Sequence, residues 1–255
     1  MYTLEHVRKV FPDGTVAVDD ITLRIEPGER VAIIGPSGAG KTTLFRLLNA
    51  TLRPTAGRLR FGAEDLGRVS SRRLRQIRRR IGTVYQQHHL VPQLRVVHNV
   101  LAGRLGRWSL TKALGSLISP RDLSTALAAL EQVGIPEKLY ARTAHLSGGQ
   151  QQRVGIARVL VQDPDVILAD EPVSSVDPTL GRAMVQLLTH LAEKRNKTLV
   201  ANLHAVSLAL DFFPRLIGFR QGRVVFDLVP ETVTEEILSD LYAGAEANLL
   251  ASEDS

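Results

Sequence analysis

The residues with the clearest chemical signature form a loop of small residues near the N-terminus. The segment from Gly35 to Thr42 reads GPSGAGKT and fits the pattern G-x-x-x-x-G-K-[ST]. It follows a β-branched run, 30–34, and precedes a segment of helical periodicity, 42–49, which is the context that this pattern requires. Successive backbone N–H groups of small residues can curl around phosphate oxygens, and the Lys41 ammonium adds a positive charge. The pattern therefore predicts a phosphate-binding loop rather than a purely structural turn.

Two adjacent carboxylates follow a second apolar run. Asp170 and Glu171 come directly after the segment 166–169. A nucleotide site needs an acidic group near the metal and a base for the attacking water. We therefore expect Asp170 to support a Mg²⁺ shell, together with the Thr42 hydroxyl, and Glu171 to polarise the water. The alternative is that either carboxylate only starts the turn at Pro172.

A third segment, Leu146 to Gln150, reads LSGGQ and lies just before a helical pattern that begins at Gln151. A serine and two glycines at a helix N-terminus leave backbone N–H groups and a hydroxyl that can meet a phosphate. Taken alone, the segment is also compatible with an ordinary helix cap. Its place shortly before the acidic strand favours a second anion-binding end.

Apolar runs and helical periods alternate around these segments, which predicts an α/β fold. Strands are expected at 2–9, 16–25, 30–34, 81–85, 166–169, 198–202 and 216–219. Between Tyr85 and Asp165 the pattern is helical, and its clearest helices are expected at 121–133 and 150–161. The tail, 231–255, reads as one short amphipathic helix and a polar end. We expect a parallel-sheet core with a helical insert.

The composition narrows the class of protein. The chain has 255 residues, is 44% hydrophobic and 23% charged, and carries a net charge of +6 without any cysteine. This balance excludes a disordered or fibrous chain, while the cysteine count excludes disulfides and favours a reducing compartment. We find neither a signal-peptide pattern nor an apolar run long enough to span a bilayer. The basic run 72–80 is interpreted as the solvated face of a short helix, so no nucleic acid is expected as a partner.

Together, the three motifs resemble the ATP-binding subunit of an ABC transporter over nearly the whole chain. The resemblance implies an α/β fold: a P-loop NTPase core with a β-subdomain and an inserted helical subdomain. It implies one ATP-binding domain over 1–250, with a RecA-like core at about 1–86 and 162–245, a helical subdomain at about 87–161 and a polar tail at 251–255.

The resemblance also assigns roles to single residues outside the three motifs. Gln86 matches the glutamine that senses Mg²⁺ and the attacking water beside the membrane partner. Asp177 matches an aspartate that crosses the dimer interface, His204 matches the histidine that contacts the γ-phosphate, and Phe11 falls where a ring stacks on adenine. Each has a plainer alternative: Phe11 as core, Gln86 as a surface amide, His204 as a helix cap and Asp177 as a helix start.

The implied site is therefore large. Its catalytic residues are Glu171, His204, Gln86 and Asp177, and its metal ligands are Thr42, Gln86 and Asp170. ATP is bound by Phe11, Gly35, Pro36, Ser37, Gly38, Ala39, Gly40, Lys41, Thr42 and Thr43, and the signature residues Ser147, Gly148, Gly149 and Gln150 act from a second subunit.

The mechanism implied by the resemblance requires partners as well as ATP and Mg²⁺. Two copies bind head to tail, so that ATP on Lys41 of one subunit is closed over by Ser147 and Gly149 of the other. Because the chain lacks a membrane segment, transport requires separate integral membrane permease subunits, and import requires an extracytoplasmic substrate-binding protein. The subunit is then peripheral, at the cytoplasmic face of the inner membrane.

Several segments are similar to the phosphonate-importer branch of the family, which moves phosphonates, phosphite or hypophosphite. They are Asn99 to Gly106, the insert 108–121, Gln150 to Arg158, and Asn202 to His204. The chain departs from that branch at His88 and His89 and after His204. Alternatives are an importer of methionine or polar amino acids, a lipoprotein-releasing complex, or a soluble ABC ATPase. The short length and the single nucleotide site count against the soluble class.

Overall fold

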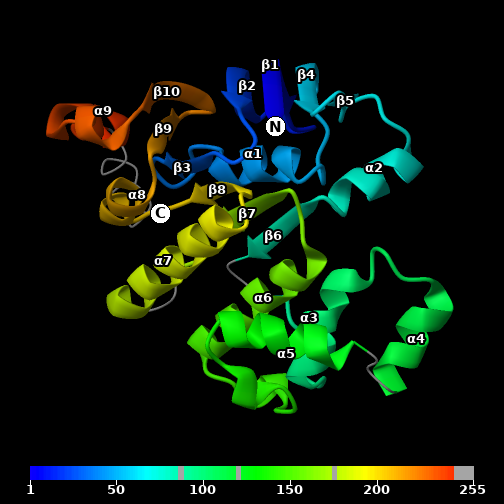
Figure 1. Cartoon of the computed structure of the whole chain (residues 1–255). Coiled ribbons are helices and arrows are strands. Elements are labelled where there is room, and N and C mark those ends of the chain that lie inside the picture. Colours follow the sequence, from blue (N-terminus) through cyan, green and yellow to red (C-terminus); the bar gives the residue numbers. More distant parts are fainter. Residues whose placement is uncertain (86–88, 119–121, 174–176, 244–255) are drawn as a thin grey trace. The chain divides into compact units, whose positions relative to one another are not determined.

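The computed structural model describes residues 1–85, 89–118, 122–173 and 177–243 (Figure 1). The chain divides into Met1–Leu74 with Thr198–Ser255, called unit 1, and Arg75–Lys197, called unit 2. The expected helical subdomain, 87–161, lies within unit 2, which also contains two strands and a long helix.

Unit 1 begins with an antiparallel sheet of strand order β2-β1-β4-β5. Its strands are β1 (Tyr2–Val10), β2 (Val16–Ile25), β4 (Ala56–Phe61) and β5 (Glu64–Asp65). Tyr2 and Leu4 of β1 are buried in alternation, and Val7 is the next buried residue after a register shift, as expected for a sheet with one covered face. The buried Tyr2 hydroxyl donates to the Leu48 carbonyl at 2.9 Å, so the first helix packs under this sheet.

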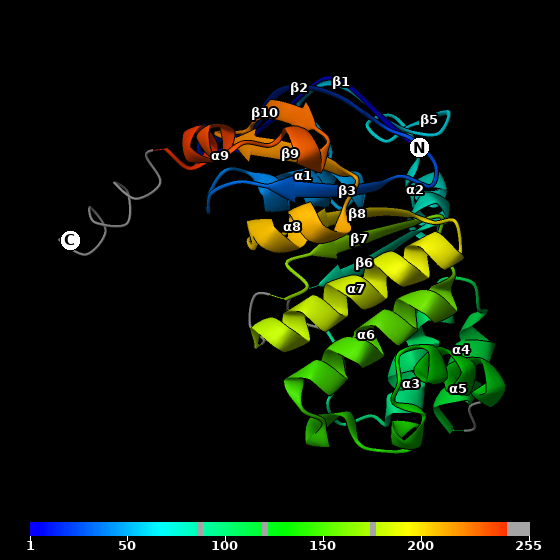
Figure 2. The ribbon, with the colours of Figure 1, turned by 60° about the vertical axis from the view of Figure 1, so that its left-hand side comes forward.

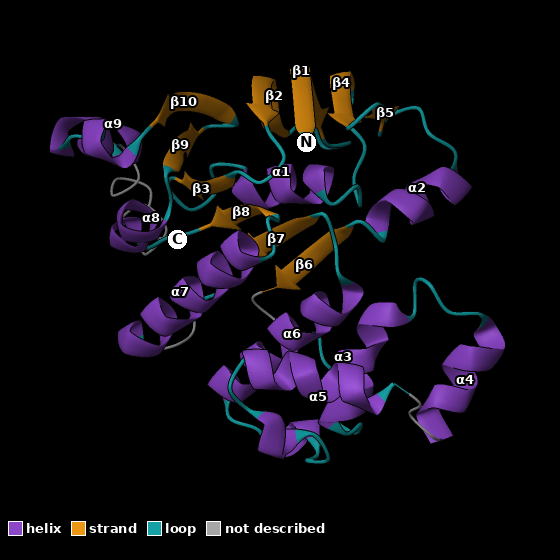
Figure 3. Cartoon of the chain, in the orientation of Figure 1, coloured by secondary structure: helices purple, strands orange, loops and turns teal. Residues whose placement is uncertain are grey.

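A second set of strands in unit 1 carries the phosphate-binding loop. β3 (Arg30–Ile34) lies parallel between β8 (Thr198–Asn202) and β9 (Arg215–Arg220), and β10 (Arg223–Leu228) pairs antiparallel with β9. Helix α1 (Lys41–Leu48) lies between the two sets of strands (Figures 1 and 3). The remaining helices of this unit are α8 (Val206–Phe212), α9 (Glu235–Tyr242) and a 3-10 turn at Pro230–Thr232.

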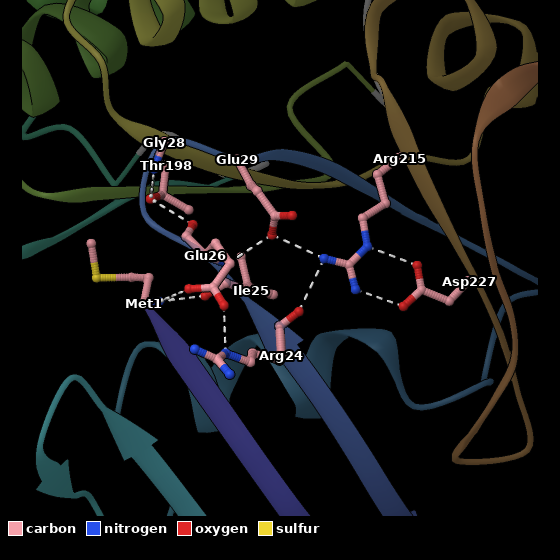
Figure 4. A network of polar contacts seen from close by, with 9 residues as sticks. All are labelled: Met1, Arg24, Ile25, Glu26, Gly28, Glu29, Thr198, Arg215 and Asp227. Carbon is pink, nitrogen blue, oxygen red and sulfur yellow. Dashed lines mark hydrogen bonds and ion pairs between the residues drawn. The ribbon is translucent and has the colours of Figure 1, made fainter.

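Side chains tie together the amino ends of β3, β8 and β9 (Figure 4). The Arg215 guanidinium donates to the Glu29 carboxylate at 2.9 Å and to both carboxylate oxygens of Asp227 at 2.6 and 2.7 Å. The Thr198 hydroxyl accepts the Gly28 N–H at 2.9 Å. The start of β3 is therefore anchored to two strands that follow it by more than 160 residues in the sequence.

In unit 2, β6 (Ile81–Tyr85) and β7 (Val166–Asp170) pair in parallel. Arg80 and Asp165, just before these strands, form an ion pair at 2.6 Å. The helices are α2 (Ser71–Arg78), which starts in unit 1, α3 (Val96–Leu101), α4 (Leu110–Ile118), α5 (Leu123–Gln132), α6 (Gly148–Gln162) and α7 (Pro178–Lys194), with 3-10 turns at Ala102–Arg104, Pro136–Lys138 and Thr143–His145. Figure 2 shows α6 and α7 side by side.

Helix α6 is the centre of the helical part because α3, α5 and α7 all pack on it. The 3-10 turn after α3 also lies against α6: a Cβ atom at Gly103 would overlap the carbonyl oxygen of Arg158 on α6. A glycine at this position thus permits a close packing of the turn on α6 that a larger residue would prevent.

The observed elements confirm the expected α/β fold. The expected helix at 121–133 is α5, and the expected helix at 150–161 is α6, which begins two residues earlier because Ser147 caps it. The antiparallel strands β4, β5 and β10 were not expected. Among the described residues, no helix is both long enough and apolar enough to cross a membrane.

Candidate nucleotide-binding site

The phosphate-binding loop follows β3, as its position after a β-branched run predicts. A Cβ atom at Gly35 would overlap the carbonyl oxygen of Phe219 on β9, and one at Gly40 would overlap the carbonyl oxygen of Ala17 on β2. Gly40 also has a φ of 101°, in the region that favours glycine. The first and last glycines of the motif are therefore required by the close approach of neighbouring strands.

The start of α1 gives the loop its chemistry. Gly40 is the N-cap residue, so no side chain caps the first backbone N–H groups of this helix, and its first turn carries no acidic residue. Lys41 is 4% exposed, and its ammonium donates to the carbonyls of Gly35 at 2.6 Å and Pro36 at 2.8 Å. Thr42, next to it, is exposed. Uncapped N–H groups, an ammonium and an exposed hydroxyl fit the phosphates and metal of a nucleotide.

Phe11 lies in the hairpin between β1 and β2 and is only half-buried. The Lys9 ammonium lies 5.7 Å from the centroid of its ring, in the range of a cation–π contact. A ring with one cationic neighbour and partial exposure can stack on a base, whereas a fully buried core ring cannot.

His204 follows β8 at the same edge of the sheet as the loop. Asn202 pairs in register with Ile33, and the N–H of Leu203 donates to the Ile33 carbonyl at 3.1 Å. The exposed His204 therefore comes next to the strand end from which Gly35 continues. Within unit 1, the structure brings this histidine and the loop to one edge, as parallel strands require.

The two carboxylates lie at the end of β7 in unit 2. Asp170 is the last residue of the strand and pairs in register with Tyr85 of β6. Glu171 has a φ of 50°, a left-handed conformation that costs a non-glycine residue roughly 1 kcal/mol and is enriched at functional sites. Gln86, predicted to follow β6, lies outside the described residues.

The LSGGQ segment forms the N-terminus of α6. The Ser147 hydroxyl accepts the Gln150 N–H at 3.3 Å, and the Gln150 side chain accepts the Ser147 N–H at 3.1 Å. A Cβ atom at Gly149 would lie 2.6 Å from the Leu180 side chain of α7, whereas one at Gly148 would meet no such group within 4 Å. The segment therefore forms an ordinary helix cap. The exposed backbone at Gly148 is also open enough to bind an anion.

Asp177 also begins a helix. Its carboxylate accepts the N–H groups of Thr179 at 2.9 Å and Leu180 at 3.3 Å, and Pro178 occupies the first helical position of α7. The loop residues before it, 174–176, lie outside the described residues. Asp177 therefore caps the start of α7, and this position is compatible with a role at an interface.

Sequence reasoning did not anticipate two neighbours of the loop. The N–H of Gly222, in the turn between β9 and β10, donates to the Ala39 carbonyl at 2.8 Å. Tyr242, at the end of α9, has a half-buried side chain; burial raises the pKa of its phenol, an effect partly offset by the backbone of Gly35. Gln221-Gly222 is not one of the dipeptides that typically mark a hairpin, such as Asn-Gly or Asp-Gly, so no signal in the sequence pointed to this contact.

Within the described residues, no group of three or more histidine and acidic side chains could hold a metal ion. The predicted Mg²⁺ ligands are of another kind, since they combine the Thr42 hydroxyl with the Asp170 carboxylate and the Gln86 amide.

Comparison with known proteins agrees with this geometry. The family model of the ABC transporter matches residues 18–174. This chain belongs to the ABC transporter family. Among its relatives in that family, phosphonates import ATP-binding protein PhnC 2 of Pseudomonas aeruginosa (strain UCBPP-PA14) is 51% identical over 94% of this chain and 90% of the relative. Phosphonates import ATP-binding protein PhnC of Lactococcus lactis subsp. cremoris is 42% identical over 95% of this chain and 98% of the relative.

Solved ABC structures share the fold. The ATP-binding cassette MJ0796, described as a dimer bound to ADP and Pi, superposes with a TM-score of 0.78 at 32% identity and covers 90% of this chain and 99% of its own. The protein cbiO1 from Clostridium perfringens, part of the transporter complex cbiONQ, gives a TM-score of 0.80 at 27% identity over 98% of both chains. These likenesses confirm the P-loop NTPase fold predicted from the motifs.

Proposed function

We propose that this chain is the ATP-hydrolysing subunit of a membrane importer for phosphonates or a related reduced-phosphorus oxyanion, phosphite or hypophosphite. The observation that carries the proposal is the 51% identity, over 94% of the chain, to a phosphonates import ATP-binding protein. Cargo itself is selected by other subunits, so the residues of this chain support the ATPase role and the relatives support the cargo.

In this proposal, the residues of unit 1 bind the nucleotide. Phe11 stacks on the adenine, and the loop from Gly35 to Thr43 surrounds the phosphates with N–H groups. Lys41 exchanges its two carbonyl partners for phosphate oxygens, and His204 contacts the γ-phosphate. Mg²⁺, held by Thr42, Gln86 and Asp170, would neutralise charge on the phosphates.

The residues of unit 2 would act on hydrolysis and closure. Glu171 takes a proton from the attacking water, which raises the nucleophilicity of that water at the γ-phosphorus. Ser147, Gly148, Gly149 and Gln150 meet the nucleotide of a second copy, and Asp177 lies at the interface. The solved structure of MJ0796, described as a dimer bound to ADP and Pi, supports a pair of copies.

The proposed assembly contains two copies of this chain, separate membrane permease subunits and an extracytoplasmic substrate-binding protein, with the chain peripheral at the cytoplasmic face of the inner membrane. We further propose that the chain is organised as a RecA-like core of about 1–86 and 162–245 with a helical subdomain of about 87–161. The placement of α3, α5 and the start of α6 within 87–161 supports that division.

Growth of a deletion strain tests cargo and catalysis together. The strain receives either the wild-type gene or Glu171→Gln and is grown on methylphosphonate, phosphite, hypophosphite or phosphate as the sole phosphorus source. We expect the deletion to prevent growth on a reduced-phosphorus source and only the wild-type gene to restore it.

The same variant is measured in vitro. Glu171→Gln should bind ATP but lose turnover by roughly two to three orders of magnitude, because the amide cannot accept the proton of water. Normal turnover would place the base elsewhere. Unchanged growth of the deletion strain on every source, with no redundant importer, would leave the ATPase assignment and remove the phosphonate cargo in favour of another importer.

A further inference from the structure

The turn between β9 and β10 has a backbone conformation that few residue types favour. It consists of Gln221 and Gly222, which have φ values of 50° and 77°. Two successive residues with positive φ are typical of the tight hairpin turn whose twist matches that of the flanking strands. Gly222 is tightly placed, because a Cβ atom there would lie 3.2 Å from the Ala17 carbonyl oxygen and 3.3 Å from the Asp19 nitrogen.

This turn bonds on both sides to elements of the nucleotide site. The N–H of Gly222 donates to the carbonyl of Ala39, in the middle of the phosphate-binding loop, at 2.8 Å. The carbonyl of Gly222 accepts the N–H of Asp19, on β2, also at 2.8 Å. β2 is one strand of the hairpin that carries Phe11. Gly222 therefore links β2 to the phosphate-binding loop by backbone hydrogen bonds.

An ion pair fixes the turn to the same strand. The Arg223 guanidinium donates to one carboxylate oxygen of Asp19 at 2.6 and 3.0 Å, and Arg8 pairs with the other oxygen at 3.1 Å. The Asp19 side chain is 21% exposed and the Arg223 side chain 64%, so solvent screens the pair from the arginine side and its contribution is modest. The turn is held by side chains, and it holds the loop by its backbone.

The loop needs this donor for a chemical reason. N–H groups that face a phosphate oblige the carbonyls of the same loop to face away, and a buried carbonyl requires a partner. Ala39 is 4% exposed, so water is largely excluded from it. The carbonyls of Gly35 and Pro36 are bonded by Lys41, which the phosphates also attract, whereas the bond from Gly222 to Ala39 does not depend on that lysine.

We infer that Gly222 is a positioning residue for nucleotide binding: its N–H sets the orientation of the Ala39 peptide and keeps the loop open to phosphate, with Arg223 and Asp19 fixing the turn. The inference rests on the proposed phosphate-binding role of the loop and extends it to a residue far away in sequence.

Two probes separate the loop from the adenine contact. Binding of Mg-ATP and of magnesium tripolyphosphate to the full purified chain is measured by calorimetry, with the thermal unfolding midpoint recorded for each variant. Gly222→Ala should weaken both probes by the same factor of about ten, because the turn shifts and the Ala39 carbonyl loses its donor. Phe11→Ala should weaken Mg-ATP and leave tripolyphosphate unchanged.

Gly62 is the matched control. It also lies in a turn, has a φ of 59° and donates its N–H, to the Met1 carbonyl at 2.9 Å, but a Cβ atom added there would meet nothing within 4 Å beyond its chain neighbours. Gly62→Ala should keep the wild-type affinity for both probes. An equal loss of affinity in Gly62→Ala would show a general effect of instability and overturn the inference.

Arg223→Gln tests the same point without a backbone change. It should weaken both probes by about threefold, since the turn keeps its hydrogen bonds but loses its ion pair. Wild-type affinity in folded Gly222→Ala, or in Arg223→Gln where Gly222→Ala does not fold, overturns the role of the turn. Undiminished affinity in Lys41→Ala would instead overturn the phosphate-binding role of the loop itself.

Discussion

The amino and carboxyl ends of β3, β8 and β9 are held by different kinds of interaction. At the amino ends, the side chains of Arg215, Glu29 and Asp227 form ion pairs of 2.6 to 2.9 Å (Figure 4). At the carboxyl ends, β3 and the loop after it are joined to their neighbours by backbone hydrogen bonds, from Leu203 to Ile33 and from Gly222 to Ala39, and glycines allow the strands to approach. The ion pair between Arg223 and Asp19 holds the adjacent turn and does not bond to the loop itself. The comparison teaches that one end is built for stability, while the other keeps its polar groups available to a ligand.

The charges at the two ends of the strands explain why only the carboxyl ends can bind a phosphate. The Asp227 carboxylate raises the pKa of the Arg215 guanidinium above its ordinary value, chiefly through their hydrogen bonds, so the guanidinium is charged throughout the physiological range. A cluster of satisfied ion pairs has no capacity left for a phosphate. The loop, by contrast, presents an ammonium that donates to two neutral carbonyls, which phosphate oxygens can replace.

The largest expected effect comes from a substitution at the carboxyl ends of the strands. Lys41→Ala removes the charge that meets the phosphates and should abolish nucleotide binding at millimolar ATP. The unfolding free energy should change little, because the variant removes both a desolvated charge and its hydrogen bonds to the two carbonyls. Calorimetric titration with Mg-ATP and urea unfolding measure the two quantities. Retained affinity would contradict the division between the two ends.

The second largest effect is expected from a substitution at the amino ends of the strands. Arg215→Gln should lower the free energy of unfolding by about 2 kcal/mol, because Asp227 and Glu29 keep their negative charges without this cation in a half-buried setting. Mg-ATP affinity should remain that of the wild type. Urea unfolding gives the first quantity and titration the second. A variant with wild-type stability but weakened nucleotide binding would reverse the roles that we give to the two ends.

The smallest expected effect sharpens the comparison within the amino end. Arg24 pairs with Glu26 at 2.5 Å, but the two side chains are 73% and 45% exposed. Solvent screens such a pair, so Arg24→Gln should leave the free energy of unfolding within about 0.5 kcal/mol of the wild type. The same urea titration checks this value. A loss as large as that of Arg215→Gln would mean that exposure does not distinguish the two arginines.

The sequence predicted much of the fold and most of the candidate site because its signals are local. The loop from Gly35 to Thr42, the carboxylates after β7 and the LSGGQ segment are short motifs in which residue type and neighbouring periodicity are sufficient. The alternative interpretation of the LSGGQ segment and of Asp177 as helix starts was likewise local, and the structure shows both caps, while the predicted roles at an interface stay predictions. Strands β4, β5 and β10 were missed, because short strands with many exposed or half-buried residues resemble loops in sequence.

By itself, the sequence determined where the phosphate-binding loop and the helix caps lie, because both depend on residues that are neighbours along the chain. Only the tertiary structure decided which distant groups support them. Gly222 reaches Ala39, and Arg215 reaches Glu29, across more than 180 residues. Hydrogen bonds and ion pairs depend on atoms within about 3 Å in space. No spacing along the chain encodes such an approach until the strands have paired.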